Sequence, residues 1–214
     1  YLIATLPSME LEIEDYPTIK KYLKSFGKRI KQTGETFIDN DGKTKRTRKK
    51  TKNKWFETQD QIKYYHEFGS PKIIYPNMTK NMPFIYDEDG YFTNQKCFII
   101  TGSHLKYLTA IFNSSLFDYC FRSNFPELLG GVVELSKVFF ERVPIKKVDK
   151  KEEKPFNQKV DQIVSLKRQN PEADITQLER EIDVMVFKLY GLTYDEVLTV
   201  EPEFWLSKEE YEAV

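Results

Sequence analysis

Cysteine, histidine and long apolar runs are scarce in this sequence of 214 residues, which contains two cysteines and two histidines. No apolar run approaches the about 20 residues that a membrane-spanning helix needs. Cys97 and Cys120 lie in apolar surroundings, without a second cysteine or a histidine at metal-ligand spacing. We therefore expect reduced core thiols in a cytoplasmic protein, with neither a disulfide framework nor a zinc site. The chain starts without a methionine or a signal-peptide pattern, so we expect a soluble piece of a longer protein.

Groups that could carry catalysis are equally scarce. His66 and His104 stand in predicted helices without the serine or carboxylate neighbours of a catalytic histidine. The chain also has no glycine-rich phosphate loop. We therefore predict no catalytic residue in this chain.

Two acidic segments have the clustered carboxylates that a metal-dependent nuclease would need. Asp87 to Asp89 has the composition of a hairpin turn, which is the commoner use of such residues. Glu152 to Lys154 stands in a charged linker beside Pro155, where no strand can position it. We predict no metal site; a self-contained nuclease stays an alternative that requires one of these segments to bind a metal ion.

The formal net charge is zero, but the charges are segregated along the chain. Residues 28–54 contain 11 lysines and arginines against 3 acids, whereas residues 151–214 contain 8 against 15. Eight of the cations fall between residues 43 and 54, where there is no acid. Local potential rather than net charge attracts a polyanion, so this composition allows a basic DNA-binding surface. From the residues alone, the segment is either a solvated loop or a phosphate-binding loop.

Apolar spacing predicts an α+β fold with a small mixed or antiparallel sheet covered by helices. Thr58 and Gln61 have the spacing of a capping box, which predicts a helix that begins there. The predicted helices of the first part span residues 16–26, 58–68 and 103–119. The predicted strands span residues 72–76, 83–86, 91–93, 97–101 and 137–145. After the charged linker at residues 146–154, two amphipathic helices predict a C-terminal helical hairpin.

Five segments, taken in order, resemble the TaqI-like C-terminal specificity domain of restriction-modification enzymes. They are "LPSMELEIEDYPTIKKYLKSFG", "KNKWFETQDQIKYYHEFGSPKIIYPNM", "YLTAIFNSSLFDYCFR", "GGVVELSKVFFERVPI" and "LEREIDVMVFKLYGLTYDEV". The ordered set is more specific than any one segment and spans nearly the whole chain. On this basis we divide the chain into an N-terminal helix with a basic loop (1–54), a TaqI-like target recognition core (55–145) and a charged linker with the helical hairpin (146–214).

The resemblance implies sequence-specific recognition of double-stranded DNA by a target recognition domain. It also implies an upstream methyltransferase domain that methylates adenine N6 with S-adenosylmethionine, in a prokaryotic cytoplasm. Some relatives are type IIG enzymes that also cleave DNA with Mg²⁺. The Asn-Pro-Pro-Tyr motif of the methyltransferase is absent, since the sequence has no Pro-Pro step. We therefore expect this chain to be non-catalytic and to hold no cofactor, while the longer protein binds S-adenosylmethionine.

The DNA contacts are assigned by region. We expect the following cations to contact phosphates: Lys45, Arg46, Arg48, Lys49, Lys50 and Lys52. We expect groove or base contacts from the turn between two strands, namely Asn77, Thr79, Lys80 and Asn81. If about five of the eight cations contact phosphates, the logarithmic salt slope of binding is about −4 to −5. We expect Trp55 to pack the basic loop against the fold rather than to stack on a base.

A structural function is the alternative to DNA recognition. In this hypothesis the C-terminal helices pack on the methyltransferase domain or on a partner subunit, and the basic loop has no DNA specificity. The apolar stripes that begin at Phe156 and Ile175 favour a packing role for that region.

Overall fold

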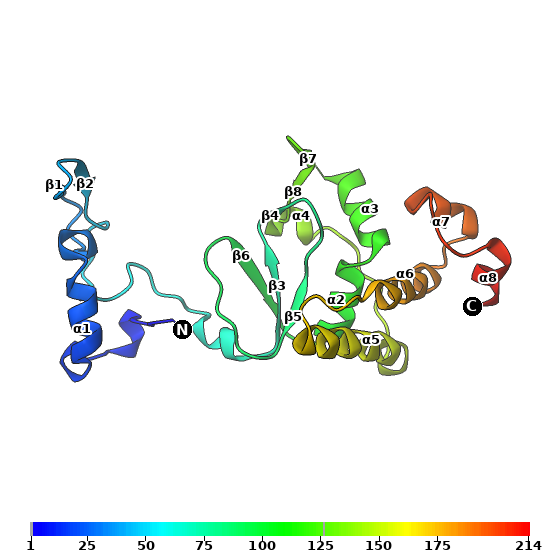
Figure 1. The fold of residues 1–214 in the computed structure, drawn as a ribbon, viewed down its shortest axis with the longest axis horizontal. Coiled ribbons are helices and arrows are strands. Elements are labelled where there is room, and N and C mark those ends of the chain that lie inside the picture. Colours follow the sequence, from blue (N-terminus) through cyan, green and yellow to red (C-terminus); the bar gives the residue numbers. More distant parts are fainter. Residues whose placement is uncertain (1, 126) are drawn as a thin grey trace. The chain divides into compact units, whose positions relative to one another are not determined.

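The computed structural model describes residues 2–125 and 127–214, so residues 1 and 126 of the predicted 1–54 and 55–145 segments lie outside the described residues (Figure 1). The chain divides into two compact units, Tyr1–His66 and Glu67–Val214. We call them unit 1 and unit 2 and describe each by itself.

Among its described residues, unit 1 contains one α-helix, one β-hairpin and short 3₁₀ helices at Pro7–Met9, Ile13–Asp15 and Gly27–Ile30. Helix α1 spans Pro17–Lys24, and the antiparallel strands β1 and β2 span Thr36–Ile38 and Thr44–Arg46. Pro17 begins α1, where the missing backbone N–H and the fixed φ of proline suit the first turn. Gly42 has a φ of 74° in the hairpin turn, a conformation that glycine adopts without steric cost.

The predicted helix at residues 58–68 is wrong, because its capping residues make other contacts. The Thr58 hydroxyl donates to the carbonyl of Asp60, and its backbone N–H donates to the carbonyl of Thr5. The Gln61 side chain exchanges hydrogen bonds with Ser8. The segment is therefore irregular until a single 3₁₀ turn at Tyr65–Gly69.

Unit 2 contains two three-stranded antiparallel sheets, which confirms the predicted fold class. The first has the order β5-β3-β6, with β5 at Ile85–Asp87, β3 at Lys72–Pro76 and β6 at Cys97–Thr101. The second has the order β4-β8-β7, with β4 at Met78–Thr79, β8 at Val132–Glu134 and β7 at Glu127–Leu128. Residues 72–76 and 97–101 were predicted as strands, and both predictions are confirmed.

Two other predicted strands are wrong. Residues 91–93 form no strand, and residues 137–145 begin with the short helix α4 (Lys137–Phe140). A strand would direct Phe139 and Phe140 to opposite faces. In α4 both rings instead contact aromatic residues of unit 2, Phe139 against Phe125 and Phe140 against Phe112.

The other helices of unit 2 are α2 (Leu105–Phe112), α3 (Ser115–Asn124), α5 (Lys150–Gln169), α6 (Thr176–Tyr190), α7 (Tyr194–Val200) and α8 (Lys208–Ala213). The predicted helix over residues 103–119 is divided at its polar centre, where the Ser114 hydroxyl accepts a hydrogen bond from Phe117 N–H and begins α3. Helix α5 begins inside the predicted linker, because Asp149 and Glu152 form a capping box.

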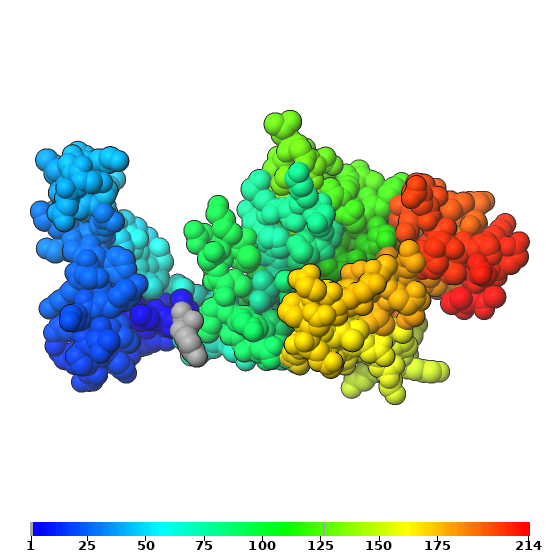
Figure 2. Space-filling view, in the orientation of Figure 1, coloured from blue at the N-terminus to red at the C-terminus, as the bar shows by residue number. Residues whose placement is uncertain are grey.

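An aromatic core holds unit 2 together. Its rings include Tyr75, Phe84, Phe112, Phe117 and Phe140. The apolar stripes of α5 and α6 join this core, and α5 packs on α2. In the space-filling view the yellow and orange atoms of the C-terminal helices lie directly against the green atoms of the preceding part of unit 2 (Figure 2). Within the described residues, no helix is long and apolar enough to cross a membrane.

Candidate nucleic-acid interface

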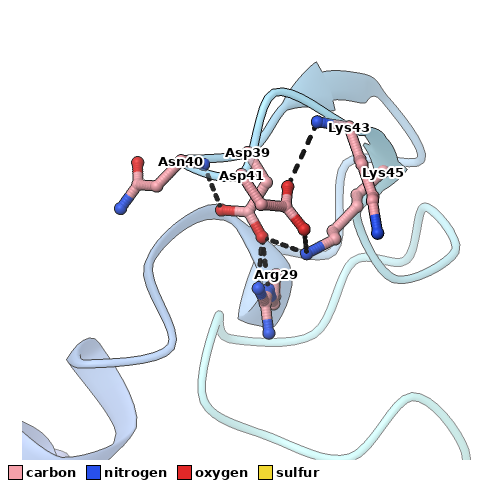
Figure 3. A network of polar contacts seen from close by, with 6 residues as sticks. All are labelled: Arg29, Asp39, Asn40, Asp41, Lys43 and Lys45. Carbon is pink, nitrogen blue, oxygen red and sulfur yellow. Dashed lines mark hydrogen bonds and ion pairs between the residues drawn. The ribbon is translucent and has the colours of Figure 1, made fainter.

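An acid-base network fixes the β1–β2 hairpin of unit 1 (Figure 3). The Lys45 ammonium donates to Asp39 Oδ2 at 2.6 Å and to Asp41 Oδ2 at 3.0 Å. Arg29 Nε donates to the same Asp39 oxygen at 3.0 Å. Hydrogen bonds from Lys45 and Arg29 hold the pKa of the Asp39 carboxyl well below its usual range. Lys45, a predicted phosphate ligand, therefore already has two carboxylate partners.

Arg48, another predicted phosphate ligand, is bound to three backbone carbonyls. Its Nε donates to Ile30 at 2.8 Å, and its two terminal nitrogens donate to Glu57 at 2.8 Å and to Trp55 at 2.7 Å. These carbonyls precede and follow the basic segment in the chain. The fixed fork of donors on a guanidinium suits such a junction, which a lysine could not reproduce.

Hydrogen bonds from two amide side chains fix the loop that follows Arg48. We call residues 49–54 the lysine loop. Gln32 donates from Nε2 to the carbonyls of Lys54 at 3.0 Å and Glu57 at 2.9 Å. Asn53 donates from Nδ2 to the carbonyls of Thr58 at 2.8 Å and Gln59 at 3.2 Å. The loop therefore has a defined shape without regular secondary structure.

The lysine loop carries four exposed lysines. One of them, Lys54, pairs with Glu12 at 2.8 Å and donates to the Leu11 carbonyl at 2.9 Å, and the other three are Lys49, Lys50 and Lys52. Lys49 pairs with Asp60 at 2.6 Å, and both side chains are more than half exposed. Lys50 and Lys52 are exposed and form no ion pair or side-chain hydrogen bond within the described part of the chain. Arg46, on β2, is exposed and donates to the Gly34 carbonyl at 3.1 Å. The structure thus leaves uncommitted or weakly paired cations at four of the six predicted phosphate positions.

Trp55 and Phe56 lie directly after the lysine loop. Phe56 is buried, and the two rings meet edge to face with centroids 5.6 Å apart. The Phe56 carbonyl accepts a hydrogen bond from the Thr5 hydroxyl at 2.9 Å. These contacts fix the residues that follow the lysine loop to the N-terminal segment of unit 1 at Thr5.

The predicted groove contacts lie in unit 2, in the turn-rich segment at residues 77–81. Asn77 joins the first sheet to the second, Thr79 belongs to β4, and Lys80 and Asn81 follow that strand. Asn77 donates its N–H to Lys96, and its carbonyl accepts from Leu135 N–H at 2.8 Å. Thr79 is paired with Val133 in the second sheet, and its hydroxyl accepts from Asn81 N–H at 3.2 Å. Because both flanks are bonded, the turn is fixed by its backbone.

The tip of the turn presents two polar side chains. Lys80 and Asn81 are exposed, while Asn77 and Thr79 are partly buried. Arg122 of α3 donates to the Lys80 carbonyl and also pairs with Asp118 at 2.8 Å. Arg122 therefore joins α3 to the turn, a contact that no sequence pattern indicates.

The two acidic segments weighed as metal sites have other partners. Asp87 is buried and forms an ion pair with the fully buried Lys72, opposite it on β3. Glu88 and Asp89 pair with Arg168 of α5. Glu152 caps α5, and Glu153 lies 2.8 Å from His104 Nδ1. Across residues 2–125 and 127–214, no group of three or more acidic, histidine or cysteine side chains is placed to bind a metal ion.

A family model of the TaqI-like C-terminal specificity domain matches residues 12–145. The match includes both the lysine loop and the turn at residues 77–81. A comparison with curated proteins found no match.

Proposed function

The chain belongs to the TaqI-like C-terminal specificity domain family, and on that premise we propose that it binds double-stranded DNA at a specific sequence. The family implies DNA target recognition in a restriction-modification context, with the chemistry performed by another domain. The observation that carries the proposal to particular residues is the cluster of exposed lysines on the lysine loop, inside the matched region.

The phosphate contacts divide into two classes. Arg46, Lys49, Lys50 and Lys52 bind phosphates first, because their charged groups are exposed and have few competing partners. Lys45 and Arg48 are already hydrogen-bonded, so they contribute with the N–H groups that remain. This division predicts a shallower salt dependence than six equal contacts would give.

Base recognition belongs to the turn at residues 77–81. The Asn81 amide suits the two hydrogen-bonding atoms of adenine in the major groove, and the Lys80 ammonium suits those of guanine. Asn77 and Thr79 are less exposed, so we assign them to the geometry of the turn and to contacts at its edge.

The longer protein would methylate adenine N6. Family resemblance supports an upstream methyltransferase domain that binds S-adenosylmethionine, with Mg²⁺-dependent cleavage in those relatives that are type IIG enzymes. In this proposal the domain described here is the DNA-recognition part and leaves the reaction to that neighbour.

Titration with DNA at two salt concentrations tests the proposal. The whole chain is titrated with a labelled mixed-sequence duplex at about 50 and 200 mM salt. The variant Lys50→Ala with Lys52→Ala should reduce the steepness of the logarithmic salt slope by about 1.8. The control, Lys154→Ala with Lys208→Ala, removes the same charge from exposed positions outside the matched region. Absence of binding at low salt, or equal losses in both variants, would overturn the proposal.

Sequence specificity needs a separate measurement. Duplexes selected from a randomised pool by the whole chain should share a common site. Asn81→Ala should bind that site more weakly by about 1–3 kcal/mol and relax the preference at one position. An unchanged preference would remove Asn81 from the base contacts, and a pool without any common site would contradict specific recognition.

A further inference from the structure

We propose that Gln32, an uncharged and buried side chain, positions the lysine loop for phosphate binding, and that Arg48 is its partner in this task. The inference rests on the proposed DNA-binding function. Gln32 affects DNA binding only through the lysine side chains that it holds in place. Arg48 has this positioning role in addition to the phosphate contact of its remaining N–H groups.

Gln32 is nearly enclosed by the loop that it supports. Only 7% of the residue is exposed. Its amide nitrogen donates to the carbonyls of Lys54 and Glu57, and its amide oxygen accepts from the Thr51 hydroxyl. Its backbone carbonyl also accepts from Thr51 N–H at 3.4 Å. One residue thereby connects the middle of the lysine loop to its end.

Arg48 closes the same loop at its base. Its guanidinium lies between the carbonyl of Ile30, before the hairpin, and those of Trp55 and Glu57, after the lysine loop. Its backbone N–H donates to Lys31 and its carbonyl accepts from Gly34 N–H, which fixes the chain on both sides of it. A single ammonium at this position could satisfy only part of this set, even though it would carry the same charge.

The arrangement matters because the loop concentrates like charges. Lys49, Lys50 and Lys52 repel one another, and a free loop would hold them apart in many conformations. Binding to a polyanion would then carry the entropic cost of ordering the loop. A loop already closed by Gln32 and Arg48 presents the three charges together, so several phosphate contacts depend on one neutral side chain.

The salt slope distinguishes a positioning residue from a phosphate ligand. Each phosphate contact that is lost reduces the steepness of the slope by about 0.9. Gln32 has no charge, so Gln32→Ala can change the slope only through other residues. We expect a reduction of more than about one, approaching about 2.7 if all three lysines lose their phosphates. We expect the same for Arg48→Lys, which keeps the charge but loses the fork of donors.

The matched control is Thr33→Ala. Thr33 is adjacent to Gln32, is exposed and forms its side-chain bond with Thr47 rather than with the lysine loop. We expect its slope to equal that of the wild type. Circular dichroism and urea unfolding of each variant establish that the fold is retained.

The outcomes separate this inference from the function on which it rests. A wild-type chain without salt-dependent DNA binding would overturn the proposed function. A wild type that binds with a steep slope, together with Gln32→Ala at the same slope, would overturn the positioning role. If Gln32→Ala does not fold, Arg48→Lys decides: a wild-type slope in that variant overturns the inference, and a reduction larger than one contact supports it.

Discussion

Different interactions stabilise the inside of each unit. In unit 1 the buried apolar side chains among the described residues are Leu6, Ile13 and Phe56. Its buried polar side chains are Thr5, Gln32, Thr47 and Glu57. Unit 2 is built around a large aromatic core. Apolar burial provides most of the free energy of folding, whereas hydrogen bonds add little net stability but fix directions. The unit that carries the basic loop is therefore defined by hydrogen-bond geometry more than by apolar burial.

The sequence provides a separate optical probe for each unit. It contains two tryptophans, Trp55 in unit 1 and Trp205 in unit 2. Variants with Trp205→Phe or Trp55→Phe each retain one emitter, so urea unfolding can be followed in one unit at a time. In these two backgrounds the stability of each unit is measured separately.

Removing a central ring should have the largest effect, and it should fall on unit 2. Phe121 of α3 is fully buried and contacts the rings of Phe117 and Phe125. Phe121→Ala should reduce the free energy of unfolding of unit 2 by about 4 kcal/mol, followed by Trp205 emission. In unit 1, Phe26 is 44% exposed, so Phe26→Ala should cost less than about 1 kcal/mol. Equal losses in the free energy of unfolding from the two substitutions would contradict the conclusion that apolar burial stabilises unit 2 more than unit 1.

Unit 2 also contains a buried ion pair between Lys72 and Asp87, and breaking it should cost nearly as much. Lys72 is 0% exposed and donates to the Phe68 carbonyl at 2.7 Å as well as pairing with Asp87. Lys72→Met leaves the Asp87 carboxylate buried without its cation, so unit 2 should lose about 3 kcal/mol. Adding Asp87→Asn removes that charge and should recover about 1–2 kcal/mol. A double variant less stable than the single one would show that charge is not the cause.

Local signals made part of the fold predictable. Helix α6 ends at Gly191, as its glycine signal predicts. The break between α2 and α3 at Ser114 was not predicted, since residues 103–119 were expected to form one helix. The spacings Thr193-x-x-Glu196 and Ser207-x-x-Glu210 predict two further capping boxes, and both are confirmed at the starts of α7 and α8. The failures at residues 58–68 and 137–145 come from distant contacts, since Ser8 binds the side chain of Gln61 and aromatic rings surround Phe140.

The candidate site was predictable in composition and not in geometry. The density of cations was visible in the sequence, and the expected phosphate contacts at residues 45–52 follow from it. Nothing in the sequence distinguishes Arg48 from Lys50, because the difference lies in carbonyls of Ile30, Trp55 and Glu57 that only the folded chain brings together. The contacts of Gln32 could not be predicted for the same reason, since a buried amide in a loop has no sequence motif.

A smaller effect should come from a single buried hydrogen bond in unit 1. The Thr5 hydroxyl is buried and donates to the Phe56 carbonyl. Thr5→Val keeps the shape and removes the donor, so unit 1 should lose about 1 kcal/mol, followed by Trp55 emission. Thr36→Val on β1 is the control, because Thr36 is exposed. If Thr5→Val cost as much stability as Phe121→Ala, a single hydrogen bond in unit 1 would contribute as much as a buried ring in unit 2. That result would contradict the proposed difference between the two units.

The mildest test compares two aspartates whose pKa values move in opposite directions. Hydrogen bonds from Lys45 and Arg29 lower the pKa of Asp39 in unit 1, whereas burial raises the pKa of Asp183 in unit 2. An unperturbed aspartate titrates at about 3.9. The stability that ionised Asp39 adds to the folded state is therefore present above pH about 3.9, and it is lost only as the pH falls through the lower folded-state pKa of Asp39. The contribution of Asp183 is full below that pH and is lost as the pH rises through its higher folded-state pKa.

Carboxyl-carbon NMR measures both titrations in one sample. As acid is added, Asp183 should protonate first and Asp39 last, with the hairpin still closed after Asp183 has lost its charge. Lys45→Met removes one of the hydrogen bonds that lower the Asp39 pKa and should move its titration toward that of an ordinary aspartate. Ser115→Ala removes the hydroxyl that donates to Asp183 at 2.7 Å and should raise that pKa further. Equal pKa values for Asp39 and Asp183, or a higher pKa for Asp39, would contradict this prediction. Such a result would mean that hydrogen bonding does not lower the pKa of Asp39 or that burial does not raise the pKa of Asp183.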